Sequence, residues 1–342
     1  MGVDLSEIVA KRQITLEFLS TKVIAVDAFN FIFQFLSNIR GPDGSPLRDS
    51  KGRITSHLSG LFYRNLKLMQ NGIKLIYVFD GKPPLLKLKT LEARAKRREE
   101  AYEAWEKAKE AGELEEAKLF AKQSASINEE IIKSSKEILE ILGIPTIQAP
   151  SDGEAQAAYL CKKGIAYAVA SQDYDTLVFG APRLIRNLAI TGKRKLPRKD
   201  IFINVEPEEI LLQETLIQNK IDQEKLIMIA LLIGNDYVDG IKGIGPKTAL
   251  KIVSKINSID ELFNFLRIKG KNFENEEEVK QAYMIFKQPE IEEIEKDEIF
   301  WKEIDEEKLL KFMCEELYFS EERIKNALKE YNQNKKKQAT LF

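Results

Sequence analysis

The stretch AYAVASQDYDTLVFG, residues 166–180, joins a short apolar run to a pair of aspartates and then to a second apolar run. An apolar run without alternation, such as residues 166–170, is typical of a strand that is covered on both faces of a parallel sheet. Asp173 and Asp175 follow it, one residue apart. Two like charges at the end of a buried strand repel each other unless a cation lies between them. The stretch therefore predicts both a parallel sheet and a cation site at one of its edges.

Two earlier segments repeat this pattern of an apolar strand that ends in an aspartate. They are VIAVDAF, residues 23–29, and IKLIYVFDG, residues 73–81. Helical patterns at residues 56–72 and 129–143 separate the strands. The alternation predicts an α/β fold with a mostly parallel central sheet and helices on both faces. The segments RLIRNLAI, 183–190, and KDIFINV, 199–205, predict further strands and an antiparallel edge.

Seven acids occupy comparable positions after strands or at helix ends. Since sites in open α/β sheets form at the carboxyl ends of parallel strands, we expect the acids to share one crevice. Oxygen ligands without histidine or cysteine favour Mg²⁺ or Mn²⁺. The acids also have structural explanations. Ser151-x-x-Glu154 matches a capping box, and Asp236 matches a turn residue. The seven acids are Asp27, Asp80, Asp152, Glu154, Asp173, Asp175 and Asp236.

The composition excludes several other classes of protein. The chain has 342 residues, of which 44% are hydrophobic and 31% charged, so it can bury a sizeable core. We find no apolar run long enough for a membrane span and no secretory signal. His57 is the only histidine, which argues against histidine-based zinc sites and triads. Cys161 and Cys314 lie far apart and indicate a reducing compartment.

The net charge of −1 conceals separate basic blocks. Residues 82–98 carry seven Lys or Arg against one Glu, and residues 192–199 carry five more basic residues. Such blocks bind a polyanion or simply form a solvated face. Residues 85–125 read as long, highly charged helices interrupted at Gly112, which predicts a helical arch that stands off the core.

The segment GIKGIGPKTALKIV, residues 240–253, has the form of a helix-hairpin-helix. Gly243 and Gly245 permit a tight turn, and Pro246 is suited to begin the next helix. Free N–H groups at that helix start, with Lys247 and Lys251 nearby, predict contacts to a DNA backbone that do not read its sequence. The last residues, from 331 to 342, predict a flexible basic tail.

Five motifs, in order and spacing, resemble the structure-specific flap endonucleases, a 5′-nuclease family, in their archaeal single-subunit form. They are VDAFNFIFQFL, YVFDGKPP, PSDGEAQAA, SQDYDTLVFG and IGNDYVDGIKGIGPKTA, and the resemblance runs from Gly2 to about residue 265. It implies an enzyme that cuts 5′ flaps of branched DNA in replication and repair, with 5′–3′ exonuclease activity. It also implies two Mg²⁺ ions, with Mn²⁺ as a substitute, held by the seven acids. Asp152 departs from the family, which commonly has Glu there, so we expect it to bind through water.

The resemblance assigns roles to further residues. Lys87 and Arg94 match two catalytic cations at the base of the arch, and their spacing of seven puts them on one helix face. Arg97 and Arg98 are expected to contact phosphates. Phe33 is expected to stack near the scissile nucleotide, with a core position as the alternative. A potassium ion at the helix-hairpin-helix is a further implication.

The expected partners are flapped DNA and a sliding clamp, and the expected state is a monomer in the archaeal cytoplasm, associated with the nucleoid. The clamp would bind a partial motif of Gln338, Leu341 and Phe342. We expect a nuclease domain at 1–265, divided into 1–80, an arch at 81–127, 128–236 and a helix-hairpin-helix at 237–265, and then a helical region at 266–330.

Two other functions are consistent with parts of the pattern. One is a non-catalytic binder of branched DNA whose acids only cap helices. The other is a phosphohydrolase that forms an aspartyl-phosphate. Its motif has a threonine two residues after the second aspartate, whereas Thr176 follows Asp175 directly.

Overall fold

A seven-stranded sheet forms the centre of the computed structural model, which describes residues 2–190, 192–195 and 202–339. The strand order is β1-β9-β6-β5-β2-β3-β4, and the five strands from β6 to β4 run parallel to one another. This confirms the predicted mostly parallel sheet. The strands are β1 Lys11–Gln13, β2 Val23–Asp27, β3 Lys74–Phe79, β4 Thr146–Gln148, β5 Ala168–Ala170, β6 Arg183–Arg186 and β9 Glu208–Leu211.

The antiparallel edge consists of β9 and β1, which differs from the predicted position. The segment 183–190 supplies β6, which lies inside the sheet and parallel to β5. The segment 199–205 supplies β8, Phe202–Val205, which pairs with β7, Gly192–Lys195, in a separate ribbon. Apolar pattern predicted these strands correctly, but it carries no information on which strand pairs with which.

Helices cover both faces of the sheet because successive strand residues point to opposite sides. In β2, Ala25 belongs to one core, while Ile24 and Val26 belong to the other. The first core packs against α6, Gly153–Lys162, α7, Asp175–Val178, and α9, Gln223–Ile233. The second packs against α1, Ala28–Asn38, α2, Ser56–Gln70, and α5, Glu129–Ile141. Helix α8, Leu212–Asn219, follows β9.

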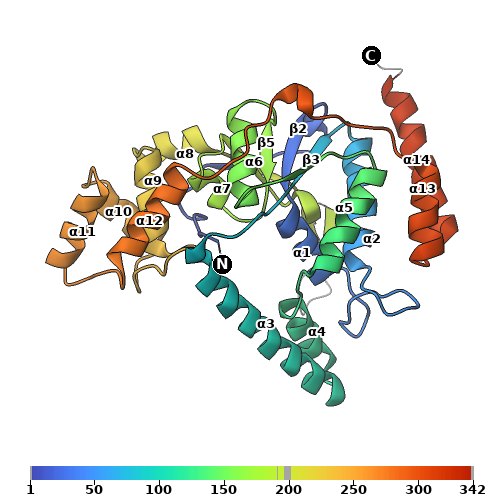
Figure 1. Cartoon of the computed structure of the whole chain (residues 1–342), viewed down its shortest axis with the longest axis horizontal. Helices are drawn as coiled ribbons and strands as arrows, with labels where there is room; N and C mark the ends of the chain where they lie inside the picture. The colour runs from blue at the N-terminus through green and yellow to red at the C-terminus, as the bar shows by residue number, and fades with distance from the viewer. Residues whose placement is uncertain (1, 191, 196–201, 340–342) are drawn as a thin grey trace.

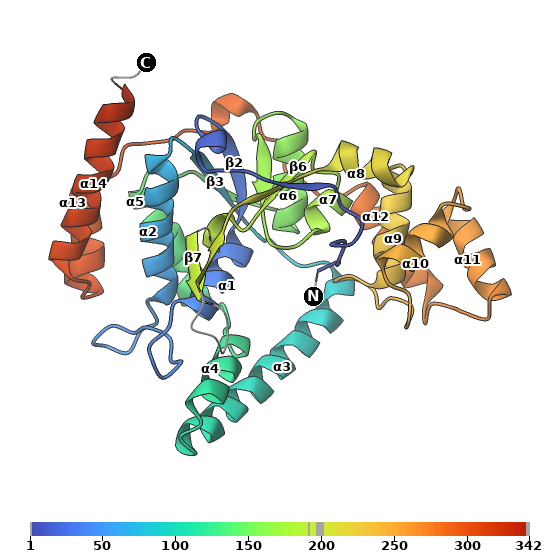
Figure 2. The same ribbon diagram turned by 180° about the vertical axis from the view of Figure 1, so that it is seen from behind.

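Helices α3, Leu85–Glu110, and α4, Leu114–Gln123, form the predicted arch and project away from the sheet (Figures 1 and 2). Their contact is made largely of small side chains, since Ala101 and Ala108 of α3 and Ala117 and Ala121 of α4 are buried. Gly112, at φ +76°, takes the left-handed conformation that the turn between them requires.

The remaining helices extend the molecule on both sides. Helices α10, Pro246–Val253, α11, Ile259–Ile268, and α12, Glu276–Lys287, lie beyond α9, while α13, Glu306–Leu310, and α14, Glu321–Ala339, pack near α2 and α5. Helix α14 replaces the flexible tail predicted from residue 331 as far as Ala339, because Tyr331 is buried against the second core. No helix in the described part of the chain is both long and apolar enough to cross a membrane.

Candidate metal centre

The seven predicted acids lie at one edge of the sheet, each placed there by a strand end or a helix start. Asp27 ends β2, Asp80 directly follows β3, and Asp173 follows β5. Asp175 begins α7. Helix α6 brings Asp152 as its N-cap and Glu154 in its first turn, and the loop after α9 brings Asp236.

Main-chain and side-chain donors hold several of these carboxylates in place. Asp27 accepts hydrogen bonds from the Asn30 amide, at 3.0 Å, and from the Ser171 hydroxyl, at 3.1 Å. Asp80 accepts one from the Gly153 amide at 2.7 Å, and Asp175 accepts one from the Val3 amide at 3.0 Å. These bonds set the direction of oxygens that are removed from bulk water.

Burial and mutual repulsion favour the protonated form of most of these acids. Burial, followed by the charges of neighbouring acids, raises the pKa of Asp27 and of Asp175 to about 7. Burial likewise raises the pKa of Asp80, Asp173 and Glu154 above their ordinary values. Carboxyl groups in this state gain most from a nearby cation, because it reverses both effects.

Glu154 is a strong candidate for a metal ligand, and the structure does not support its alternative role as a helix cap. One of its oxygens, Oε1, is buried and has no hydrogen-bond partner among the residues that the structure describes. The capping box of Ser151 and Glu154 is not formed, since Asp152 is the N-cap of α6 and its side chain makes no capping hydrogen bond. A buried carboxylate oxygen without a donor carries a desolvation cost that a cation would remove.

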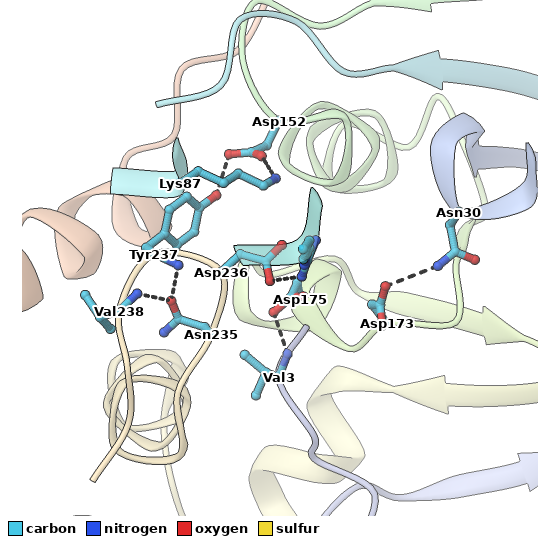
Figure 3. Close-up of polar contacts among 11 residues, drawn as sticks. Val3, Asn30, Lys87, Asp152, Asp173, Asp175, Asn235, Asp236, Tyr237 and Val238 are labelled. Carbon is cyan, nitrogen blue, oxygen red and sulfur yellow. Dashed lines mark hydrogen bonds and ion pairs between the residues drawn. The ribbon is translucent and has the colours of Figure 1, made fainter. Parts of the chain in front are cut away.

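The arch brings two cations into the acid cluster, as Figure 3 shows for Lys87. The Lys87 ammonium donates to Asp152, and the Arg94 guanidinium donates to Asp236. Although burial opposes it, the carboxylates of Asp152 and Asp80 raise the pKa of Lys87 above its usual range. Lys87 and Arg94 therefore lie on the same face of α3 in the structure, as their spacing predicts.

Ion pairs and hydrogen bonds already occupy several oxygens of the acid cluster. Among the described residues, no three His, Cys, Asp or Glu side chains stand in a ready-made metal-binding arrangement. The cations of α3 neutralise two of the acids, and backbone donors hold others. The oxygen-only donor set and the unpartnered Glu154 oxygen nevertheless fit hard divalent cations, for which the acids would close in.

The other predicted residues lie outside the acid cluster. The Phe33 ring is 38% exposed, so it is not the core residue of the alternative interpretation. Arg97 is exposed, and the Arg98 guanidinium donates to the main-chain oxygen of Arg94 at 3.2 Å. Gln338 lies in the last turn of α14, while Leu341 and Phe342 fall outside the described residues.

The helix-hairpin-helix joins α9 to α10. Gly243, at φ +81°, uses the left-handed conformation, whereas Gly245 is the N-cap of α10 and does not. Pro246 begins α10 as predicted, so that the helix start lies open beside the exposed Lys247 and Lys251. Lys247 pairs with Glu7 at 3.0 Å.

Sequence reasoning missed three residues that contact the acids. A side chain on Gly2 would meet the Asp175 carboxylate, since a Cβ there would lie 2.2 Å from Oδ2. The Tyr237 hydroxyl donates to Asp152, and the Asn30 side chain donates to Asp173 at 3.2 Å (Figure 3). Gly2 and Asn30 have no local signature, but Tyr237 directly follows Asp236 and could have been considered.

An α/β sheet with seven acids at one edge, contacted by two cations at the base of a helical arch, defines a class of metal-dependent phosphodiesterases. Comparison with known proteins identifies the family. The XPG N-terminal domain matches residues 1–101, and the XPG I-region matches residues 143–236. Flap endonuclease 1 of Pyrococcus furiosus is 52% identical, over 100% of this chain and 98% of that protein.

Solved structures agree with this match. Flap endonuclease-1 from Methanococcus jannaschii superposes with a TM-score of 0.74 at 36% identity, over 97% of this chain and 98% of the other. The catalytic core of Rad2 in complex with a DNA substrate gives a TM-score of 0.68 at 25% identity, over 94% and 96%. The chain belongs to the flap endonuclease family, within the XPG and Rad2 nucleases.

Proposed function

We propose that this protein is a metal-dependent, structure-specific nuclease that cleaves 5′ flaps of branched DNA in replication and repair, with an associated 5′–3′ exonuclease activity. One observation carries the proposal. Seven carboxyl groups share one sheet edge, and the two arch cations that contact them lie on a single helix face. The match to Flap endonuclease 1 relatives over the whole chain supports it.

We assign two Mg²⁺ ions, with Mn²⁺ as a substitute, to the seven acids. Bound there, the ions would stabilise the charge on the attacking and leaving oxygens of the phosphodiester. We expect Glu154 to bind an ion directly through its unpartnered oxygen. We expect Asp152 to bind through water, because its side chain already accepts hydrogen bonds from Lys87 and Tyr237.

Lys87 and Arg94 have a role that is separate from metal binding. They are paired with acids here, but both lie at the base of α3, where an incoming phosphate would compete for them. When Lys87 and Arg94 contact the scissile phosphate in place of the acids, they would orient it and stabilise negative charge in the transition state.

The substrate is expected to span two regions. The helix-hairpin-helix would hold duplex backbone at the start of α10, with a potassium ion assisting there, and would not read sequence. Phe33, which is partly exposed on α1, would stack on a base near the cut site, and Arg97 and Arg98 would contact phosphates of the same strand.

A labelled 5′-flap substrate tests the function in one assay. We expect cleavage at the branch with Mg²⁺ or Mn²⁺ and none with EDTA. Asp173→Ala and Asp175→Ala should abolish cleavage while flap binding survives. A protein that binds flaps without cutting them at any metal concentration would support the non-catalytic binder. Turnover of small phosphate esters through a trapped aspartyl-phosphate would support the phosphohydrolase.

We also propose a monomer associated with the archaeal nucleoid, with a sliding clamp as its partner through Gln338, Leu341 and Phe342. Removal of residues 338–342 should leave flap cleavage by the free enzyme unchanged and abolish its stimulation by the clamp. Equal stimulation of the shortened and full chains would contradict the clamp assignment.

A further inference from the structure

Tyr237 is buried beside the acid cluster, although it is neither a predicted metal ligand nor a cation of the arch. Its side chain is 6% exposed, and it directly follows Asp236 in the loop after α9. The Tyr237 hydroxyl donates to Oδ2 of Asp152, while the Lys87 ammonium donates to Oδ1 of the same carboxylate (Figure 3). A neutral hydroxyl therefore holds one oxygen of Asp152, and a cation holds the other.

Hydrogen bonds within the loop fix the main chain at Tyr237. The Asn235 side-chain oxygen accepts from the main-chain amide of Tyr237 at 2.8 Å and from that of Val238 at 3.2 Å (Figure 3). The Asn235 side-chain amide donates to the main-chain oxygen of Ala230, in α9, at 3.2 Å. These contacts attach the loop to the end of α9, so the position of Tyr237 is defined by a helix of the first core.

Aromatic packing fixes the direction of the Tyr237 ring. Phe286 of α12 lies edge-on to it, with ring centroids 5.1 Å apart and an angle of 81° between the planes. Phe286 also contacts Phe179, which directly follows α7, with centroids 4.9 Å apart. Both phenylalanines are buried. A ring that is packed in this way has little freedom to move, so its hydroxyl keeps its place when the surroundings change.

Lys87 differs from Tyr237 in its freedom to move. Its ammonium is carried on a flexible four-carbon stem and lies 6.0 Å from the centroid of the Tyr237 ring. In the proposed reaction, Lys87 contacts the scissile phosphate in place of Asp152. Because the Asp152 side chain is only 5% exposed, the loss of one donor from this carboxylate is costly unless the other donor remains.

We propose that Tyr237 is a positioning residue that holds the Asp152 carboxylate in place when Lys87 moves to the scissile phosphate. This inference rests on the proposed nuclease function and deepens it, because it explains how a cation of the arch can change partners without displacing an acid. Tyr237 acts only through Asp152 and does not touch the phosphate. Its hydroxyl keeps its proton throughout, so the step transfers no proton.

Tyr237→Phe tests the role of the hydroxyl, since it keeps the ring against Phe286. We expect the single-turnover rate of flap cleavage at saturating Mg²⁺ to fall by about tenfold or more, because a hydrogen bond to a charged group is lost. Flap affinity in EDTA should change by less than about twofold, since the lost hydrogen bond is not made to DNA. A parental cleavage rate for Tyr237→Phe would overturn the proposal.

Tyr283→Phe is the matched control. The Tyr283 hydroxyl and the Lys287 ammonium donate to the two oxygens of Glu224, at 2.8 and 2.5 Å, so this carboxylate has the same kinds of donor as Asp152. Glu224 lies at the start of α9 and is not one of the seven acids. Tyr283→Phe should therefore leave the cleavage rate unchanged.

A double-mutant cycle shows whether Tyr237 acts through Asp152. In the Asp152→Ala background, Tyr237→Phe should change the single-turnover rate by less than about twofold, because the carboxylate that it holds is absent. The same loss of rate in both backgrounds would indicate a general structural role for Tyr237 and would overturn the proposal.

Metal binding provides a readout that does not depend on turnover. Isothermal titration with Mn²⁺ compares the free protein with its complex with a flap whose scissile linkage keeps its charge but cannot be hydrolysed. Tyr237→Phe should bind Mn²⁺ as the parent does when free, because Lys87 still holds Asp152, and about tenfold more weakly in the complex. An equal change in both states, including no change in either, would overturn the proposal.

Cleavage by the parent separates the two levels of inference. If the parent cuts flaps and Tyr237→Phe behaves like the parent, only the positioning role is wrong. If the parent does not cut flaps with Mg²⁺ or Mn²⁺, the proposed function itself fails.

Discussion

Glu154 stands out at the level of single residues because one of its carboxylate oxygens is buried without a partner in the described part of the chain. Glu154→Gln keeps the shape of the side chain but removes the charge that would bind an ion. We expect flap cleavage to fall by about 100-fold or more, because a lost metal ligand weakens transition-state stabilisation. The melting temperature should not fall, since a buried charge is removed. Metal titrations of cleavage and thermal melts measure the two effects.

The neighbouring Asp152 provides the comparison. Asp152→Asn should be the milder change and should mainly raise the Mg²⁺ concentration needed for half-maximal rate, whereas Asp152→Glu should keep activity. A Glu154→Gln enzyme that cuts at the parental rate throughout the titration would remove Glu154 from the metal site.

Proton competition at the acids predicts how metal affinity depends on pH. Asp27 and Asp175 have a pKa of about 7 without metal, so protons occupy them below that pH. The Mg²⁺ concentration for half-maximal cleavage should therefore rise as pH falls from 8 to 6. Isothermal titration with Mn²⁺ over this range measures the same change, and a pH-independent affinity would contradict it.

The stability of the metal-free protein should fall as pH rises, whereas metal affinity should increase. The pKa of Asp175 in the folded state is raised from 3.8 to about 7, so the folded state binds more protons than the unfolded state between these values. Stability is therefore lost as pH rises through about 7. Asp175→Asn should stabilise the EDTA-treated protein by on the order of 2 kcal/mol at pH 8 and by much less at pH 4. Urea unfolding at both pH values measures this difference.

Gly2 is a residue whose lack of a side chain matters. A Cβ at this position would lie 2.2 Å from Asp175 Oδ2 and 3.0 Å from the Asp173 side chain. Gly2→Ala should therefore displace both carboxylates and lower cleavage by about tenfold or more, because small misplacements at reacting groups are costly. Asp4→Ala, near the same turn but exposed, is the control. Parental single-turnover rates for Gly2→Ala would show that the segment adjusts freely.

At the level of secondary structure, the arch helix α3 combines two functions in one continuous element. Its base reaches the acids through Lys87 and Arg94, while its outer part packs mainly against α4, and Lys109 pairs with Asp43 at 3.6 Å. A helix of this polarity has no large apolar face, so its position depends on these ion pairs and on the contact with α4. The arch is therefore the part of the nuclease domain whose position is most sensitive to charge.

Substitutions in the arch test that arrangement. Lys87→Ala and Arg94→Ala should lower the single-turnover cleavage rate by about 100-fold, and flap affinity by only a few-fold, because both charges act on the scissile phosphate. Lys96→Ala, an exposed residue on the same helix, should change neither value strongly. A loss confined to binding would make Lys87 and Arg94 ordinary phosphate contacts.

At the level of the whole molecule, the acids lie between two regions that we propose to bind DNA. The helix-hairpin-helix lies on one side of the sheet edge, and α1 and the arch lie on the other (Figures 1 and 2). A branched DNA has a duplex part and a single-stranded part, so two such regions would let cleavage depend on shape and not on sequence.

Salt dependence tests the duplex side of this division. Lys251→Ala in α10 should weaken binding to every flap substrate equally, whatever its base sequence, and should lower the salt slope by about one. Lys280→Ala in α12, outside the hairpin, is the control. A scrambled flap bound tenfold more weakly by the parent at matched salt would show that sequence is read.

The positions of several candidate site residues followed from local patterns in the chain. Apolar strands that end in Asp27, Asp80 and Asp173 indicate a parallel sheet whose carboxyl edge collects acids, because strand direction alone determines that edge. Lys87 and Arg94 are seven residues apart, which is about two helical turns, so the helical period places both on one face of α3. The start of α10 at Pro246 also followed from local sequence.

Other features depend on contacts between distant parts of the chain. The antiparallel edge depends on pairing between β1 and β9, and the helical form of residues 331–339 depends on burial of Tyr331 against the second core. The contact of Gly2 with Asp175 and the unpartnered oxygen of Glu154 arise only when separate segments meet. Local patterns report periodicity and charge, whereas burial and pairing are set by neighbours that are remote in the sequence.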